Sequence, residues 1–548
     1  MSEAPSTRQR APLLWLLIPW MLGLVVGRLI PWPMNHDMVL GTGILLALVS
    51  SLAASRPVLW GALLAASAIC TAASWSQIAR NRLPDWDGRA PREAVLEVKV
   101  ERLFAGQPDL RKAGGLGRIT GARSHLSSLV GQKIQFSGRM RSGVPRPMRS
   151  SVIEIAGQLE VVPRLAPPGT FDGYLSGAGV NFKLTRARIL SERSPALSYW
   201  RWCDRMQHTM CEQVGVGLES RPALVGVLRA VLLGSSGELS AEQDTWFTQS
   251  GTLHLFSVSG LHVGVIAMAF SGVLSALRVP AWARFIVIIV LLWLYVDVTG
   301  RAPSAVRAFL MVALFQFAKV MRLPPNNMSI LTSTAMLVLV VDPMQLFSAS
   351  FQMSYGIVLA LISLGLPMAR AWEDRHPMFH DRPLVLWTWR HRLSDSIRRA
   401  LIGALALGLA TLPVSLVTGV LIFGLATPGA LFANLVSIPL ASIGLIAGFC
   451  SLMASACGEN LLGIVFNHAG ALALAAVDHG AERFVQIPGI SFAARFRTPS
   501  AGHLALLILI GLCLAGLQTG WNRRMGGFWL PFVFTAFVMI LLVTFPSG

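Results

Sequence analysis

Long apolar runs alternate with short polar segments along most of this chain. Each run approaches the roughly 20 apolar residues that an α-helix needs to cross the hydrocarbon core of a bilayer. The pattern predicts a polytopic α-helical membrane protein of about thirteen spans. They lie near residues 12–31, 38–55, 57–79, 252–278, 281–299, 304–322, 329–345, 347–369, 398–421, 428–454, 460–482, 501–519 and 527–545.

One long polar segment, from about residue 82 to 196, interrupts this pattern after the third span. Apolar and polar residues partly alternate at Val95–Glu101, Lys133–Gly138 and Val152–Ile155, which is typical of strands. Glycines and prolines separate these stretches, as expected for turns. Several short strands in one segment favour a small β-rich domain. An OB-like barrel, a common platform for single-stranded DNA, fits this pattern.

Two amphipathic helices are predicted after the polar segment, at about 198–216 and 221–234. Ser240-Ala-Glu-Gln243 then has the residues of a helix capping box. We therefore expect five parts along the chain. They are a three-span anchor (1–81), a β-rich, OB-like basic domain (82–196), amphipathic interfacial helices (197–240), a many-span transmembrane domain (241–485) and a two-span segment (486–548).

The composition agrees with a membrane protein and adds a strong positive charge. The chain of 548 residues is 53% hydrophobic and 13% charged, with a formal net charge of +19. Its mean hydropathy of +0.59 is too high for a soluble globular protein. One source of the charge is the positive-inside bias of multi-span proteins. The other interpretation is a polyanionic substrate or anionic lipid.

The positions of the charges predict an orientation. Arg8 and Arg10 precede the first span, so we place the N-terminus in the cytoplasm and the β-rich domain outside. The loop from Arg370 to Arg399, with seven arginines, and the loop with Arg523 and Arg524 then lie inside, whereas Arg495 and Arg497 are exceptions outside. Residues 80–193 contain 20 Lys and Arg against 10 Asp and Glu, a net of +10 in a domain expected outside.

The sequence lacks the motifs of a cysteine-based metal site and of a P-loop motor. The six cysteines form no CxxC and no Cys/His cluster, so we expect no zinc site. We also expect no other metal and no cofactor. No lysine follows a glycine, so the chain has no Walker A motif and cannot itself be a P-loop motor.

Residues 250–264 (SGTLHLFSVSGLHVG) gather polar groups at the mouth of a predicted span. Polar groups in such a position are costly and usually mark a pathway or a site. His254 and His262 are eight residues apart, which on a regular helix puts them about 80° out of alignment. The two imidazoles would therefore not face one metal ion.

This segment closely resembles the signature of the ComEC family of inner-membrane DNA channels in naturally competent bacteria. Further stretches are similar to that family. They are Pro168–Leu175, Leu232–Ser240, Thr299–Ala308, Asp342–Leu346, Ser350–Ser354 and Asn434–Pro439. Ser350 departs from the family pattern, in which glycine is expected. The His-x-His-x-Asp-His motif of the metallo-β-lactamase-like domain found in many members is missing from this sequence.

The resemblance implies a channel that passes single-stranded DNA into the cytoplasm during natural transformation. It also implies a DNA receptor outside, an ATPase or helicase-like protein inside and a separate nuclease as partners, in addition to membrane lipids. We expect the protein to be a channel and not an enzyme. The candidate residues of the DNA path are His254, Ser257, Ser259, Gly260, His262, Arg301, Ser304, Arg307, Gln352, Ser354 and Asn434.

Structural roles are the alternative for each of these residues. Histidine, glutamine, serine and asparagine in spans often form hydrogen bonds between helices. Arg301 could pair with Asp297 at the membrane interface rather than contact phosphate.

Two other functions compete with the channel. One is a transporter of small molecules or lipids that uses the same bundle. The other is an intramembrane serine protease, but Ser257-Val-Ser-Gly260 has serine where the rhomboid-type motif has glycine.

Overall fold

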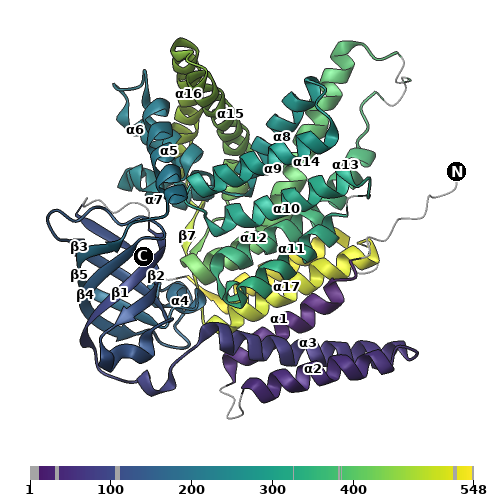
Figure 1. The fold of residues 1–548 in the computed structure, drawn as a ribbon. Helices are drawn as coiled ribbons and strands as arrows, with labels where there is room; N and C mark the ends of the chain where they lie inside the picture. The colour runs from purple at the N-terminus through teal and green to yellow at the C-terminus, as the bar shows by residue number, and fades with distance from the viewer. Residues whose placement is uncertain are drawn as a thin grey trace.

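The computed structural model describes residues 11–30, 36–104, 111–324, 326–379, 383, 386–521 and 527–545. A small β-barrel stands beside a larger bundle of helices (Figure 1). Arg8, Arg10, Arg382, Arg523 and Arg524, on which part of the predicted orientation rests, lie outside the described residues.

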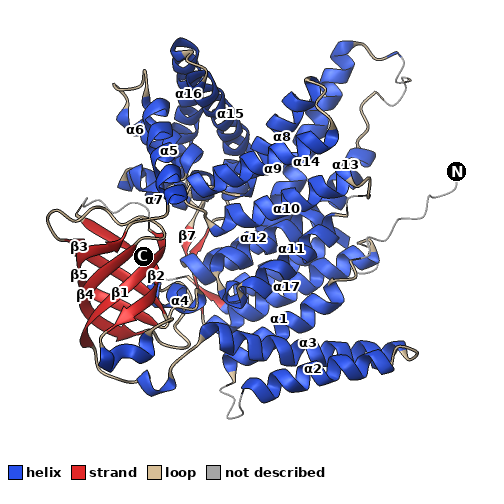
Figure 2. Cartoon of the chain, viewed as in Figure 1, coloured by secondary structure: helices blue, strands red, loops and turns tan. Residues whose placement is uncertain are grey.

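Five strands close the barrel: β1 (Arg92–Leu103), β2 (Lys112–Ala122), β3 (Lys133–Met140), β4 (Val152–Val161) and β5 (Phe182–Ser194). Their order is β1-β2-β3-β5-β4, and β4 pairs with β1 to complete the ring. β3 and β5 are parallel, and the other pairs are antiparallel. The strands form the red cylinder in Figure 2. The β-rich domain predicted from alternating residues is thus confirmed.

The alternation explains why these residues form strands. In β1, Leu96, Val98 and Val100 point into the barrel and are at most 1% exposed. Phe136 of β3 and Ile155 of β4 are fully buried against them. Every second side chain therefore fills the core, and the intervening ones face outward.

Three apolar helices precede the barrel: α1 (Leu14–Leu29), α2 (His36–Leu52) and α3 (Pro57–Arg80). α3 packs against both others, and Gly23 and Gly27 let α1 approach it closely. A Cβ atom at Gly27 would clash with the carbonyl oxygen of Ala73. The short helix α4 (Phe171–Gly177), between β4 and β5, lies where the barrel meets the bundle (Figure 1).

Eleven helices described after the barrel and before residue 460 build most of the bundle. They are α5 (Ser198–Gly215), α6 (Pro222–Leu233), α7 (Ala241–Gln249), α8 (Gly260–Ala276), α9 (Ala281–Val298), α10 (Pro303–Val320), α11 (Asn327–Val341), α12 (Ala349–Ala360), α13 (Leu366–Arg375), α14 (Trp389–Thr418) and α15 (Ala430–Ala456). α16 (Asn460–Val485), α17 (Pro499–Thr519) and α18 (Leu530–Leu542) follow. Short strand pairs β6 (Leu425–Ala426) with β7 (Phe492–Ala493) and β8 (Arg495–Phe496) with β9 (Val543–Thr544) join loops of this part.

The two helices predicted as amphipathic differ from one another. α5 keeps a mostly polar outer face, whereas eight residues of α6 are buried, including Val227, Leu228 and Val231 at 0% exposure. α6 packs against α15 and α16, and its buried residues belong to the core of the bundle. The predicted capping box is confirmed, because Ser240 and Gln243 make both reciprocal hydrogen bonds at the start of α7.

Within the described residues, eight helices are long and apolar enough to cross a membrane, so the protein is a membrane protein. These helices coincide with eight of the predicted spans. The other five predicted spans fall on shorter apolar helices (α1, α2, α8, α11 and the helix over 527–542), and the count of thirteen is not confirmed. α11 is short because it ends at Val341, ahead of Asp342 and Pro343.

Candidate functional site at the start of three helices

The polar segment 250–264 does not form the single helix that was predicted to begin near residue 252. A short 3₁₀ helix covers Leu253–Phe256, residues 257–259 are extended, and α8 begins only at Gly260. Gly251 has a φ of +73°, which favours glycine and turns the chain before the 3₁₀ helix. His254 and His262 are therefore not on one helix, and the angle predicted between them does not apply.

His262 and Ser259 lock the start of α8. The Ser259 backbone N–H donates to Nδ1 of His262 over 3.2 Å, and the Ser259 hydroxyl lies 2.9 Å from the same nitrogen. The imidazole is only 2% exposed. Both side chains are thus part of a helix cap and hold the segment in place, rather than facing an open space.

Three other positions of the same segment remain accessible. His254, Ser257 and Gly260 are exposed, whereas Leu255, Phe256 and Val258 between them are buried. The His254 ring nitrogen Nδ1 lies 3.1 Å from the carbonyl oxygen of Gly251. The segment therefore anchors its apolar side chains in the core and presents an imidazole and a hydroxyl outward.

The start of α10 lies against this segment. The Ser304 hydroxyl donates to the carbonyl oxygen of Val258 over 2.9 Å. A Cβ atom at Gly260 would be 3.7 Å from Cβ of Ala308, so the first turns of α8 and α10 are in contact. Ser304 thus joins the extended residues 257–259 to α10.

Arg307, one turn further along α10, is buried at 2% exposure. Its Nη2 donates to the backbone oxygen and to the hydroxyl of Ser350, both over 2.7 Å. Nε and Nη1 are also buried but have no hydrogen-bond partner, and no carboxylate pairs with this guanidinium among the described residues. A buried arginine without a counter-charge is costly, which makes it a candidate for a functional residue.

Ser350, which stands where the family pattern has glycine, provides an additional hydrogen-bond acceptor for Arg307. It lies in the first turn of α12, and its hydroxyl accepts one of the two hydrogen bonds from Arg307. A glycine there would leave only the backbone oxygen as an acceptor. Arg307 thereby links α10 to the start of α12, and the start of α8 packs beside it against Ala308 of α10.

Arg301 has partners of its own, as the structural alternative anticipated. Its Nε lies 3.7 Å from the Asp297 carboxylate, and its guanidinium stacks 5.1 Å from the Trp293 ring. Tyr199 of α5 donates to the other Asp297 oxygen over 2.8 Å. Burial, together with this carboxylate, raises the pKa of Tyr199. Arg301 therefore belongs to a network that ties α5 to α9.

The remaining candidates lie further along their helices. Gln352, on α12, donates from Nε2 to the carbonyl oxygen of Leu346 over 3.2 Å. Ser354 is half-buried one turn after Ser350. Asn434, near the start of α15, has a buried Oδ1 with no hydrogen-bond partner. The structure thus brings Ser257, Ser259, Gly260, His262, Ser304 and Arg307 together, whereas no hydrogen bond joins Gln352 or Asn434 to that group in the described part.

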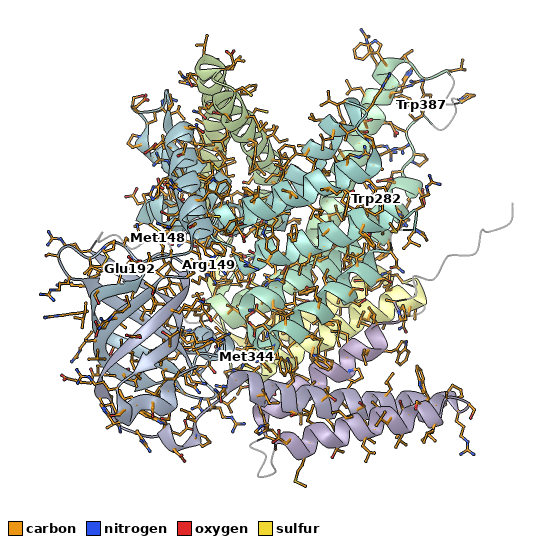
Figure 3. All side chains as sticks on the ribbon, viewed as in Figure 1. Met148, Arg149, Glu192, Trp282, Met344 and Trp387 are labelled. Carbon is orange, nitrogen blue, oxygen red and sulfur yellow. The ribbon has the colours of Figure 1, made fainter. Side chains whose placement is uncertain are left out.

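Sequence reasoning missed Tyr199 and the role of Ser350. Tyr199 is 98 residues from Asp297, and Ser350 is 43 residues from Arg307. No spacing rule connects such distant positions. Figure 3 labels Arg149 where the barrel faces the helices, and its guanidinium stacks 4.2 Å from the ring of Trp200 in α5.

These features define a polytopic helical membrane protein with a closed barrel and a polar cluster at three helix starts. The family model described as Competence protein matches residues 231–521, which is more than half of the chain. The chain belongs to this family. The matched region contains all the candidate path residues from His254 to Asn434.

A curated relative supports the same assignment. ComE operon protein 3 of Bacillus subtilis (strain 168) is 25% identical over 211 residues, which are 38% of this chain and 27% of the relative. The match therefore spans about a quarter of that relative's length. No solved structure matches the chain.

Proposed function

We propose that this protein forms the membrane channel through which a single strand of DNA enters the cytoplasm during natural transformation. The observation that carries the proposal is Arg307, whose guanidinium is buried where α10 meets the start of α12 and has two nitrogens, Nε and Nη1, without a hydrogen-bond partner. The Competence protein family and the similarity to ComE operon protein 3 support the same function.

Helix starts and a guanidinium favour the same kind of ligand. The first turn of a helix has free backbone N–H groups and a partial positive charge, which attract phosphate. Arginine adds donors in a fork that matches phosphate oxygens. A nucleic-acid backbone that passes this place would supply the negative charge that Arg307 lacks in the described structure.

The candidate residues then take two roles in the proposed path. His254, Ser257 and Gly260 line it because they are exposed, and Arg307 because it carries unused donors. Ser304 lines it at the point where it joins residues 257–259 to α10. Ser259 and His262 shape it through the cap of α8. Gln352, Ser354 and Asn434 are polar positions further along, and Arg301 acts through its network with Asp297.

For the barrel we propose an OB-like domain outside the inner membrane, with the N-terminus in the cytoplasm. The five-stranded closed ring, its order and its parallel β3–β5 pair support this comparison. In the same scheme, residues 1–81 anchor the barrel, 197–240 connect it, 241–485 form the channel and 486–548 add two spans.

The proposal implies partners. A DNA receptor would deliver the strand outside, an ATPase or helicase-like protein would pull it inside, and a separate nuclease would degrade the other strand. The absence of a Walker A motif from the sequence agrees with an external motor.

Import of labelled double-stranded DNA into a deletion strain of a transformable host tests the function. Surface-bound and cytoplasmic label are scored separately after complementation with the wild type, Arg307→Leu or the exposed control Arg322→Leu. We expect deletion to spare surface binding and abolish cytoplasmic entry, with rescue by the wild type and the control only. Unchanged entry after deletion would refute the channel and favour a transporter of small molecules or lipids.

A further inference from the structure

A groove on the outer wall of the barrel is lined by arginines that have no acidic partner. It measures about 530 Å³ and runs over β1, β4, β5 and the loop after β2. Arg92, Arg123, Arg186 and Arg188 line it, with Glu93 as the one acidic residue and His125 beside them. All four arginines are exposed, and none forms an ion pair with a described carboxylate.

Several other basic side chains of the barrel have acidic partners. Elsewhere on the same barrel, Arg118 pairs with Glu101, and Arg193 pairs with Glu154 and Glu97. Lys183 is held between Asp172 and Glu160. Acidic side chains are therefore available on this barrel, yet the groove concentrates four positive charges against one negative charge.

The backbone under the groove is distorted in a way that presents Arg186. The strand register pairs Gln158 with Thr185 and Ala156 with Arg188, so Arg186 and Ala187 together oppose the single residue Gly157. This is a β-bulge, a feature that often re-aims a side chain next to a site. Arg186 has a φ of +49°, in the left-handed region that is uncommon for residues other than glycine.

Gly157 is required for the bulge. A Cβ atom there would lie 2.8 Å from Cβ of Ala187, closer than side-chain carbons can approach. The chain thus combines a strained arginine and an obligatory glycine at the floor of the groove. Such strain persists where the surroundings impose it, and it is common at binding sites.

From these observations we propose that this groove binds the phosphate backbone of single-stranded DNA before the strand reaches the helices. The inference rests on the proposed function and adds the place on the barrel where the strand is received. Guanidinium groups along a groove can contact successive phosphates without reading the bases. Arg92, which stacks 5.0 Å from the Trp86 ring, is held in position at one end.

Binding of a fluorescein-labelled oligo-dT to the full-length protein in detergent tests the groove. The variant Arg123→Gln/Arg186→Gln/Arg188→Gln removes three of its charges. The control Arg139→Gln/Arg141→Gln/Arg146→Gln removes three charges from exposed positions of the barrel outside the groove. We expect the groove variant to weaken binding at least tenfold and the control to change it less than threefold. The slope of log K against log salt should fall in magnitude by about 2, since each phosphate contact to a single strand contributes about 0.7.

Arg186→Asn separates binding from folding. Asparagine tolerates the left-handed conformation better than arginine does, so the barrel should keep its melting temperature while affinity falls. Equal losses in the groove variant and the control would overturn the proposal in favour of a diffuse positive surface. Loss of binding to phosphatidylglycerol vesicles with unchanged oligo-dT affinity would overturn it in favour of a lipid site.

The import assay distinguishes this inference from the channel itself. If the groove variant binds oligo-dT normally while Arg307→Leu blocks entry, the groove is wrong and the channel stands. If the groove variant loses binding while deletion leaves DNA entry unchanged, the groove binds DNA and the channel is wrong.

Discussion

The barrel and the bundle use arginine in opposite ways. In the barrel groove, four guanidinium groups are exposed and gathered on one wall. At the start of α10, a single guanidinium is buried and holds two unpaired donors. Exposed charges attract a polyanion over some distance and are weakened by salt, whereas a buried charge acts only at contact and is screened much less. In our proposal the barrel groove therefore binds the DNA strand first, and the strand then passes Arg307 in the bundle.

The largest effect is expected at the buried arginine. Arg307→Leu removes the donors proposed to contact the passing strand, and hydrogen bonds to charged groups contribute about 1.5–3 kcal/mol. Cytoplasmic entry should therefore fall about 10- to 100-fold at an unchanged amount of inserted protein. The substitution deletes the two hydrogen bonds to Ser350 but also removes a buried charge without a counter-charge, so the melting temperature should fall only slightly. A strong drop would mean that Arg307 serves packing rather than passage.

The barrel groove and Arg307 should differ in how strongly their effects depend on salt concentration. For three phosphate contacts in the groove, raising salt from 50 to 200 mM should weaken oligo-dT binding about 20-fold. The binding of the groove variant should respond much less. The ratio of entry between wild type and Arg307→Leu should stay nearly constant over the same salt range. A ratio that collapses with salt would remove the distinction between the exposed and the buried site.

A smaller effect is expected at the cap of α8. His262→Ala removes the acceptor for the Ser259 backbone N–H, and losing a helix cap costs about 1 kcal/mol. Thermal unfolding in detergent should begin at a lower temperature. Ser257→Ala, at an exposed position of the same segment, should leave unfolding unchanged. Equal melting curves for His262→Ala and wild type would contradict the capping role.

The smallest effect is expected where the arginine is already paired. Tyr199→Phe deletes the hydrogen bond to the Asp297 carboxylate, and a hydrogen bond to a charged group contributes about 1.5–3 kcal/mol to stability. DNA entry should stay within about twofold of wild type, because Arg301 keeps its contact with Asp297. A loss of entry comparable to that of Arg307→Leu would place this network on the path.

The sequence predicts local secondary structure well but contacts between distant residues poorly. Alternation in Val95–Glu101 predicts a strand correctly, because one face of β1 fills the barrel core. The prediction that a helix begins near residue 252 is wrong. Leu253, Leu255 and Phe256 keep the local hydropathy high, but Gly251 turns the chain and α8 begins only at Gly260. Arg307 and Ser350, or Arg92 and Arg186, come together only through the packing of helices or the closure of the barrel.

The most direct test places a photo-crosslinking amino acid at residue 257 during import of labelled DNA. Ser257 is exposed beside the start of α8, and Met268 on the same helix, at 68% exposure, is the control position. We expect the incoming strand to crosslink at position 257 and not at 268. Crosslinking at 268 alone, or at neither position while DNA enters normally, would contradict a path past the three helix starts.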